Sequence, residues 1–199
     1  MSLKKASILI IIILLIDQIS KVYVKMNFSL GEDVTVFNWF KILFVENEGM
    51  AWGTKIPGEY GKLILTLFRL VAVTGIAYWL WLSIKENRSR LLVVAVSLIF
   101  AGAVGNIIDS VFYGLIFNDS YHQVATFMPE SGGYGALFHG KVVDMLYFPM
   151  WKGYMPQWLP FIGGKFMTFF EPVFNVADVA ISTGVGLLIV FNKKAFSNS

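Results

Sequence analysis

The sequence predicts an all-α membrane protein of four transmembrane helices, with a small β-rich segment and a long loop outside the membrane. Three observations lead to this fold class. The chain has 199 residues, of which 56% are hydrophobic and 16% aromatic, whereas soluble domains average roughly 45–50% apolar residues. The mean hydropathy of the chain is +0.66. Four segments are also long and apolar enough to cross a bilayer, which takes about 20 residues.

The predicted elements follow one another in a simple order along the chain. The first span follows Lys4 and Lys5 as in a secretory signal peptide, but no small-residue cleavage site comes after it, so we expect an uncleaved helix. The connection 25–62 contains VTVFNWFKILFVEN, whose β-branched and aromatic residues predict short strands. The connection 114–171 is rich in Gly, Pro and aromatic residues and predicts an outer loop or lid. Residues 1–199 form one membrane domain, and its spans are 6–24, 63–84, 91–113 and 172–191.

Basic residues near the ends of the spans predict the orientation of the chain. Cytoplasmic connections carry an excess of Lys and Arg, and four spans place the three basic clusters on the same side. Both termini are therefore expected in the cytoplasm, and both long connections outside. The clusters are Lys4 and Lys5, then Lys85, Arg88 and Arg90, then Lys193 and Lys194.

The composition excludes several kinds of chemistry. The net charge of +3 is small for a nucleic-acid-binding protein, and the basic residues lie beside apolar segments rather than in a patch. The chain has no cysteine, which excludes disulfides, thiolate catalysis, cysteine-ligated metals and lipidation of the chain itself. The histidines, His122 and His139, both lie in one loop, so a histidine-rich metal site on the helices is excluded. We expect no metal and no cofactor.

Ionisable and amide side chains within the predicted spans gather at one depth. Such groups are costly in a bilayer and usually functional. When the helices are followed in their alternating directions, these side chains fall in the outer halves, while the inner halves carry almost no charge. One polar site in the outer leaflet accounts for this distribution. Its candidate residues are Asp17, Lys21, Arg69, Asn106, Asp109, Asn175 and Asp178.

Structural roles remain open for several of these residues. Asp17 and Lys21 are spaced i, i+4 and can form a pair that only holds helices together. Asn106 can serve as a hydrogen-bonding group between helices, and Arg69 can extend toward the outer headgroups. A structural role explains Asp178 less well, because no basic residue lies in its own helical turn.

Five short motifs occur in order along the chain: DQISK at 17–21, NEGMAWG at 47–53, GNIID at 105–109, VVDM at 142–145 and FNVADVAI at 174–181. Together they resemble the lipoprotein signal peptidases, the signal peptidase II family of aspartic peptidases. Each motif is weak alone. The resemblance is specific because all five occur in the family's order, on its four-helix plan, over nearly the whole chain.

The resemblance implies roles for particular residues. Asp144 from VVDM and Asp178 from FNVAD match the catalytic pair, in which two carboxylates share one proton. Asp17 and Lys21 match family positions whose role is more structural. Positions that shape the family's active site are matched by Asn47, Gly49, Asn106, Asp109 and Asn175.

The chain also departs from the family pattern. Ser110 stands where the motif Gly-Asn-x-x-Asp-Arg has its arginine, and we hypothesise that Arg69, at a suitable depth, compensates. Met145 replaces the usual phenylalanine after the aspartate, a mild change. The segment between Asp109 and Asp144 is longer than is usual in the family, which an elaborated lid or an inert surface insertion would both explain.

The resemblance therefore implies an aspartic endopeptidase that removes signal peptides from diacylglyceryl-modified prolipoproteins. It would act at the outer leaflet of the bacterial cytoplasmic membrane, as a monomer, with the lipid-modified substrate and membrane lipid as its partners. Two other classes remain open, a small transporter or proton channel using intramembrane carboxylates, and a membrane scaffold without chemistry. A transporter predicts polar residues through the full depth of the bilayer, and the apolar inner halves argue against it.

Overall fold

The structure is a computed structural model that describes residues 1–48, 57, 60–169 and 172–197. Gly49 and most of the motif at 47–53 lie outside the described residues. In the described part, the helices are α1 (Leu3–Lys25), α2 (Gly61–Lys85), α3 (Arg90–Ile108), α4 (Gly114–Ile116), α5 (Val176–Val190) and α6 (Asn192–Ala195). A π-helical turn, η2 (Asp109–Tyr113), joins α3 to α4.

Three of the described helical segments are long and apolar enough to cross a bilayer: Leu3–Lys25, Gly61–Lys85 and Arg90–Ile116. The chain is thus a multi-pass membrane protein, as predicted. The fourth predicted span, 172–191, begins later than expected, because Val173–Phe174 pair in a sheet and α5 starts only after Asn175. Its 15 residues are apolar but cover about 22 Å, less than the roughly 30 Å hydrocarbon core of a bilayer.

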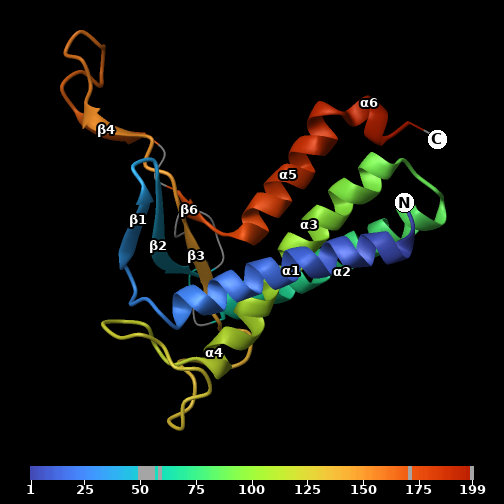
Figure 1. The fold of residues 1–199 in the computed structure, drawn as a ribbon, viewed down its shortest axis with the longest axis horizontal. Coiled ribbons are helices and arrows are strands. Elements are labelled where there is room, and N and C mark those ends of the chain that lie inside the picture. Colours follow the sequence, from blue (N-terminus) through green and yellow to red (C-terminus); the bar gives the residue numbers. More distant parts are fainter. Residues whose placement is uncertain (49–56, 58–59, 170–171, 198–199) are drawn as a thin grey trace.

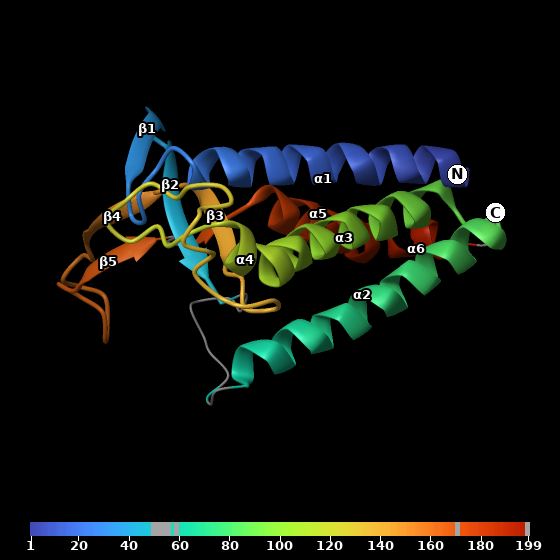
Figure 2. The same cartoon turned by 90° about the horizontal axis from the view of Figure 1, so that it is seen from below.

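Helix α3 is the central helix of the bundle and contacts α1, α2 and α5. Both chain termini and the α2–α3 connection lie at one end of the bundle, and the β-strands lie at the other end (Figure 1). Figure 2 shows that α2 diverges from α1 toward its Gly61 end. The three basic clusters therefore lie together at the end of the bundle opposite the strands.

Glycines allow α3 and α5 to approach closely. A Cβ atom on Gly102 would lie 2.3 Å from the carbonyl oxygen of Ala177, and one on Gly184 would lie 2.6 Å from that of Ala95. Small residues at helix contacts are the usual means of bringing backbones together in lipid. The close contact places the first turn of α5 directly against α3 near Gly102.

One antiparallel sheet combines strands from both long connections and from the start of the fourth predicted span, in the order β1-β2-β3-β6. The prediction of an all-α protein with strands only in the first outer segment was therefore incomplete. VVDMLY in the second segment forms a strand because its partners, β2 and β6, come from distant parts of the chain. The bounds are β1 (Asp33–Phe37), β2 (Phe40–Asn47), β3 (Val142–Tyr147) and β6 (Val173–Phe174).

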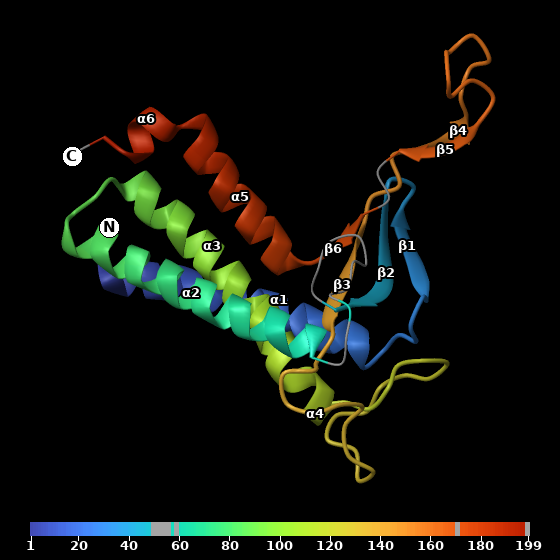
Figure 3. The ribbon, with the colours of Figure 1, turned by 180° about the vertical axis from the view of Figure 1, so that it is seen from behind.

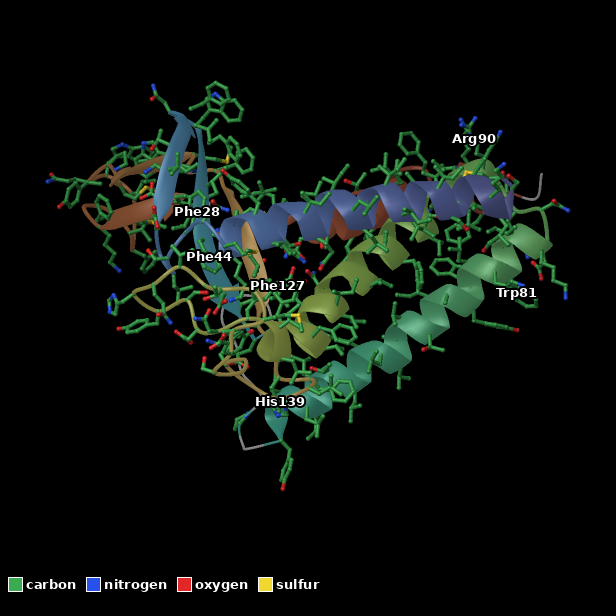
Figure 4. The ribbon with its side chains drawn as sticks, turned by 60° about the horizontal axis from the view of Figure 1, so that its bottom comes forward. Phe28, Phe44, Trp81, Arg90, Phe127 and His139 are labelled. Atoms are coloured by element: carbon green, nitrogen blue, oxygen red, sulfur yellow. The ribbon has the colours of Figure 1, made fainter. Side chains whose placement is uncertain are left out.

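A separate hairpin of β4 (Trp151–Tyr154) and β5 (Phe166–Phe169) extends away from the helices (Figure 3). Some residues of the connection between α4 and β3 pack against the sheet instead, although its loops project beyond α4 (Figure 3). Its Phe117 joins Phe44 of β2 and Val143 of β3 in a buried apolar cluster. Figure 4 shows Phe28, Phe44 and Phe127 near the junction of α1 and the sheet, at the opposite end of the bundle from Trp81 and Arg90.

Candidate active site

Strand β3 carries Asp144 into a buried position at the membrane end of the sheet. Val143 and Met145 enter the apolar cluster on one face of the strand, so the side chain of Asp144 points to the other face. The register of β2 against β3 shifts between Ile42 and Val45, and Val45 is the residue opposite Asp144. Bulges of this kind often redirect a side chain beside an active site. Asp144 is only 5% exposed.

The first turn of α5 holds Asp178 through a reciprocal capping arrangement. Asn175 is the N-cap, and its side-chain oxygen accepts a hydrogen bond of 2.9 Å from the backbone N–H of Asp178. The Asp178 carboxylate accepts a bond of 3.2 Å from the backbone N–H of Asn175. The positive end of the helix dipole also favours a carboxylate at this position. The sequence FNVAD thus fixes the side chain of Asp178 by local geometry.

Two asparagines connect Asp144 with Asp178. The Asn175 side-chain amide donates to Asp144 Oδ1 at 2.7 Å and to Asn106 Oδ1 at 3.1 Å. The Asn106 amide in turn donates to Asp178 Oδ1 at 2.9 Å. Asn47, at the end of β2, donates to the other oxygen of Asp144. Four separate elements therefore converge on one pair of carboxylates.

The environment of Asp144 favours its protonated form. Burial raises its pKa, and the neighbouring carboxylate of Asp178 raises it further, to about 7 from an ordinary value of 3.8. Hydrogen bonds from Asn175 and Asn47 act in the opposite direction, because they stabilise the charged form. Near neutral pH, the site can therefore hold a proton that an exposed aspartate would release.

A second polar layer lies on the helix side of this pair and centres on Lys21, which is fully buried. The Lys21 ammonium lies 3.0 Å from Asp17, 2.9 Å from Asp109 and 2.8 Å from the Asn106 side-chain oxygen. Gln18 adds hydrogen bonds to Asp17 and to Asp109. Lys21 thus holds Asn106 in the orientation in which its amide reaches Asp178.

The two acidic members of this layer also bind backbone groups of the elements that carry the pair. Asp17 accepts a bond of 2.9 Å from the N–H of Ala177, and Asp109 accepts one of 3.3 Å from the N–H of Val143. Gly105 leaves room for Asp17, since a Cβ atom there would lie 2.6 Å from its carboxylate. Asp17 and Asp109 therefore position α5 and β3 relative to the helices.

The π-helical turn contains Ser110, the residue in place of the family's arginine. Ser110 is buried, and its hydroxyl donates to the backbone oxygen of Asn106 at 3.0 Å. The loop before β3 packs on this turn, where Gly140 donates to the Ser110 carbonyl at 2.9 Å. A Cβ on Gly140 would lie 2.0 Å from the Asp109 carbonyl oxygen, so only glycine fits. Ser110 therefore shapes the backbone and extends no charged group into the site.

The structure brings together every sequence-predicted site residue that it describes. Among them, Arg69 interacts electrostatically with Asp178, and its Nη1 atom is buried. Gly49 lies outside the described residues. The residues brought together are Asp17, Lys21, Asn47, Arg69, Asn106, Asp109, Asp144, Asn175 and Asp178.

Sequence reasoning missed two contributors. Gln18 lies next to Asp17 in the first motif. Its place in that motif was the only feature of the sequence that could have indicated a role in the site. Lys25 ends α1 and looks like an interfacial residue, yet it is fully buried, paired with Glu46 and bonded to Ser120 at 3.0 Å. This pair joins the connection 114–171 to the face of the sheet opposite Asp144. No sequence pattern near Lys25 predicts that contact.

A model of the family described as signal peptidase (SPase) II matches residues 9–193. The chain belongs to the signal peptidase II family. Members of this family are aspartic proteases. In the part of the chain that the structure describes, no group of three or more His, Asp or Glu side chains has the arrangement of a metal site.

Relatives and solved structures agree with this membership. A lipoprotein signal peptidase of Porphyromonas gingivalis is 47% identical over 188 residues, covering 94% of this chain and 82% of the relative. One of Amoebophilus asiaticus is 41% identical over 184 residues, covering 90% of this chain and 73% of the relative. A solved structure of a bacterial membrane enzyme has a TM-score of 0.65 at 23% identity, covering 99% of this chain and 92% of its own. This last likeness shows that the signal peptidase II chain shares the fold of that enzyme.

Proposed function

We propose that this chain is the aspartic endopeptidase that removes the signal peptide from diacylglyceryl-modified prolipoproteins, with Asp144 and Asp178 as its catalytic pair. The observation that supports the pair most directly is the asparagine bridge, which links the buried carboxylate of Asp144 to the partly buried carboxylate of Asp178 from a distant segment. Relatives at 47% and 41% identity are named lipoprotein signal peptidases, which supports the substrate class.

The chemistry follows from two carboxylates that hold one proton. The ionised carboxylate takes a proton from water as the general base, and the water oxygen attacks the scissile carbonyl carbon. The protonated carboxylate donates its proton to the carbonyl oxygen, which gives a tetrahedral gem-diol. The carboxylate that gave up its proton then takes one from a gem-diol hydroxyl, the other carboxylate protonates the amide nitrogen, and the C–N bond breaks, so the pair returns to its starting state with one proton. Two adjacent carboxylates cannot both ionise cheaply in a buried site, so the pair titrates as a unit. Burial and the charge of Asp178 both favour a retained proton on this pair near pH 7.

The other site residues act on this pair or on the peptide. Asn47, Asn106 and Asn175 fix the orientations of the carboxylates, and Asp109 holds the backbone of β3 at Val143. Asp17 and Lys21 form the supporting layer. Gly49 belongs to the same motif as Asn47, and we assign it to the site on that motif alone. The site as proposed uses no metal and no cofactor, and the enzyme acts as a monomer.

The proposed topology has four spans in the bacterial cytoplasmic membrane, with both termini in the cytoplasm. The length of α5 agrees with this arrangement. A helix that begins at Val176, already within the outer leaflet, needs only about 22 Å to approach the cytoplasmic surface. Lys193 and Lys194 follow α5 at the end of the bundle that also holds Lys4, Lys5 and the α2–α3 connection. The active site then faces the extracytoplasmic side.

The inner half of the bundle offers no relay of charges for a transporter. The buried polar side chains described there include Ser83 and Ser97, and each hydroxyl donates to a carbonyl of its own helix. Buried ionisable side chains of the described segments lie at the outer end, on α1, η2 and β3. The enzyme is therefore favoured over the transporter.

Cleavage of a synthetic lipopeptide by the purified protein tests the proposed function. The acyl chains hold the substrate in the lipid beside the site, so we expect a peptide with an S-diacylglyceryl cysteine to be cleaved immediately before that cysteine. The same peptide without lipid should be cleaved at least about 100-fold more slowly, because it loses the proximity that the bilayer provides. Mass spectrometry of the products identifies the bond. Equal cleavage of both peptides would contradict the assigned substrate class.

The pH dependence of cleavage tests the proton held at Asp144. Activity should fall on the alkaline side as the pair loses its proton near the pKa of about 7. Asn47→Ala removes a donor that stabilises the charged form of Asp144, so the pKa rises and the alkaline limb moves to higher pH. The measurement is kcat/KM against pH for both proteins. An alkaline limb that stays in place, or moves to lower pH, would show that Asn47 does not act on this proton.

A further inference from the structure

Arg69 carries a hydrogen-bond donor that its surroundings leave unused. It lies about two turns inside α2, and its Nη1 atom is buried without a hydrogen-bond partner among the described residues. A buried donor of a charged group is expensive to leave unpaired, so such an atom in a folded protein calls for an explanation. An arginine that simply extends to the outer headgroups would expose its terminal nitrogens. The burial of Nη1 therefore points to a partner that reaches it away from the lipid headgroups.

The helical face that carries Arg69 is turned toward the active site. Lys62, Thr66 and Arg69 are spaced i, i+4, i+7 and share one face of α2. Thr66 is buried and its hydroxyl donates to the Phe138 carbonyl at 3.1 Å, in the loop that packs on the π-helical turn. Lys62 donates at 2.6 Å to the carbonyl of Glu48, next to the Asn47 that binds Asp144. The face thus contacts both segments that border the carboxylate pair.

Arg69 also lies within electrostatic range of Asp178. Its guanidinium interacts electrostatically with the Asp178 carboxylate, which is only partly buried in this structure. The guanidinium group has five N–H donors in a fixed plane, so it can face Asp178 and still offer a donor to another acceptor. An acceptor that reaches this spare donor approaches the face of α2 whose Lys62 and Thr66 contact the segments bordering the catalytic pair.

The substrate brings such an acceptor. A peptide bond must leave the helical conformation to be attacked, and the carbonyl groups next to it then lose their helical hydrogen bonds. Within the outer leaflet there is little water to replace those bonds, so the enzyme has to supply donors. We propose that Arg69 is a substrate-binding residue, whose free Nη1–H donates a hydrogen bond to a main-chain carbonyl oxygen of the signal peptide beside the scissile bond. This inference rests on the proposed function, because it needs a peptide substrate at the pair.

The first test measures binding without catalysis. In the background of Asp178→Asn, the charge that Arg69 faces is gone, so any remaining effect of Arg69 comes from its hydrogen bond. We expect the dissociation constant of the intact lipopeptide to rise about 10- to 100-fold from D178N to D178N/R69Q. Equal affinities would overturn the proposal, since Arg69 would then act only through Asp178. Binding is read from a fluorophore on the peptide, and melting temperatures show that both variants are folded.

The second test measures cleavage and separates the two kinds of substrate carbonyl. R69Q should lower kcat/KM by about 10- to 100-fold, and R69K by less, because lysine keeps a charged donor with a different geometry. R88Q changes an exposed arginine paired with Glu86 at the other end of the bundle, so it serves as the control with normal activity. The loss in R69Q should be the same for a peptide that carries a dialkyl glyceryl ether, which has no ester carbonyls. A loss that disappears with the ether lipid would assign the bond to the lipid ester and overturn the peptide assignment.

Failure of the proposed function would look different from failure of this inference. If the wild-type protein cleaved neither lipopeptide, the peptidase assignment itself would fall. If the wild type cleaved both and R69Q matched it, only the role of Arg69 would fall.

Discussion

Asp144→Asn and Asp178→Asn are each expected to reduce kcat for lipopeptide cleavage by about 10³-fold or more. Each substitution keeps the size of the side chain but removes either the general base or the acid that shares its proton. The loss should appear in kcat rather than in KM, because the amide still fills the site. The rates are measured with purified protein at saturating lipopeptide.

The two variants should differ in their stability. In D178N, one side-chain oxygen can still cap α5, but the amide group then faces the donor of Asn106, which Lys21 holds in place. That lost bond should cost about 1 kcal/mol of the free energy of unfolding. D144N instead removes a carboxyl whose ionised form is disfavoured by burial.

The direction of the pH effect on D144N follows from the two pKa values of that carboxyl. The folded protein keeps the proton up to about pH 7, whereas the unfolded chain releases it near the ordinary pKa of 3.8. Wild-type stability from this group therefore falls as pH rises through that interval. D144N lacks this fall, so its melting temperature relative to that of the wild type should rise as the pH increases toward 8, although its amide group must face the donor of Asn47 or of Asn175. A variant that melted well below the wild type would mean that its inactivity reports unfolding.

A matched control removes a carboxylate elsewhere. Asp33 lies on β1 and pairs with Lys41 at the surface, so D33N should keep both activity and melting temperature. Near-normal turnover by D144N or D178N would end the case for the catalytic pair.

Residues that serve the site could be predicted from the sequence when their signal was local. Asp178 and Asn175 stand three apart within the predicted span 172–191, and the structure uses that spacing as a cap, because α5 begins only after Asn175. The apolar lengths of the three long helices likewise follow from composition. Asp144 was assigned from its motif, but its strand depends on pairing with β2 and β6, which lie far away in the chain. Pairing with distant strands produces no hydrophobic periodicity that could be recognised within the six residues of β3.

The sequence did not predict the burial of side chains whose partners lie far away in the chain. The burial of Lys25 depends on Glu46 and Ser120, which come from β2 and from the long outer segment. The bond of Thr66 to the Phe138 carbonyl depends on how α2 lies against the loop before β3, and the burial of Arg69 Nη1 on the same helical face could not be read from the sequence. The π-helical turn at Asp109 has a similar origin, since the loop at Gly140 packs directly on it. Helical periodicity places a residue on a face, and only the packing decides what that face meets.

Lys21→Met should destabilise the protein more than any other single change considered, by about 3–5 kcal/mol. Lys21 is fully buried between Asp17 and Asp109, so its loss leaves two carboxylates without a cation in a low-dielectric place. Activity should fall as well, because Asn106 loses the contact that directs its amide to Asp178. The free energy of unfolding is measured in detergent micelles by tryptophan fluorescence. K41M, which breaks an exposed pair, should change it by less than about 1 kcal/mol.

A double substitution separates the loss of the charge from the loss of packing. In K21M/D109N, one of the two stranded carboxylates is replaced by a neutral amide of the same size. The electrostatic explanation requires this protein to be more stable than K21M, although D109N alone removes an ion pair and should be destabilising. If the two losses simply added, the role of Lys21 would be one of filling space. A partial recovery of the free energy of unfolding would instead show that Lys21, Asp17 and Asp109 are stable in the interior only when all three charges are present. The lysine beneath the carboxylate pair is then needed to neutralise the two buried carboxylates.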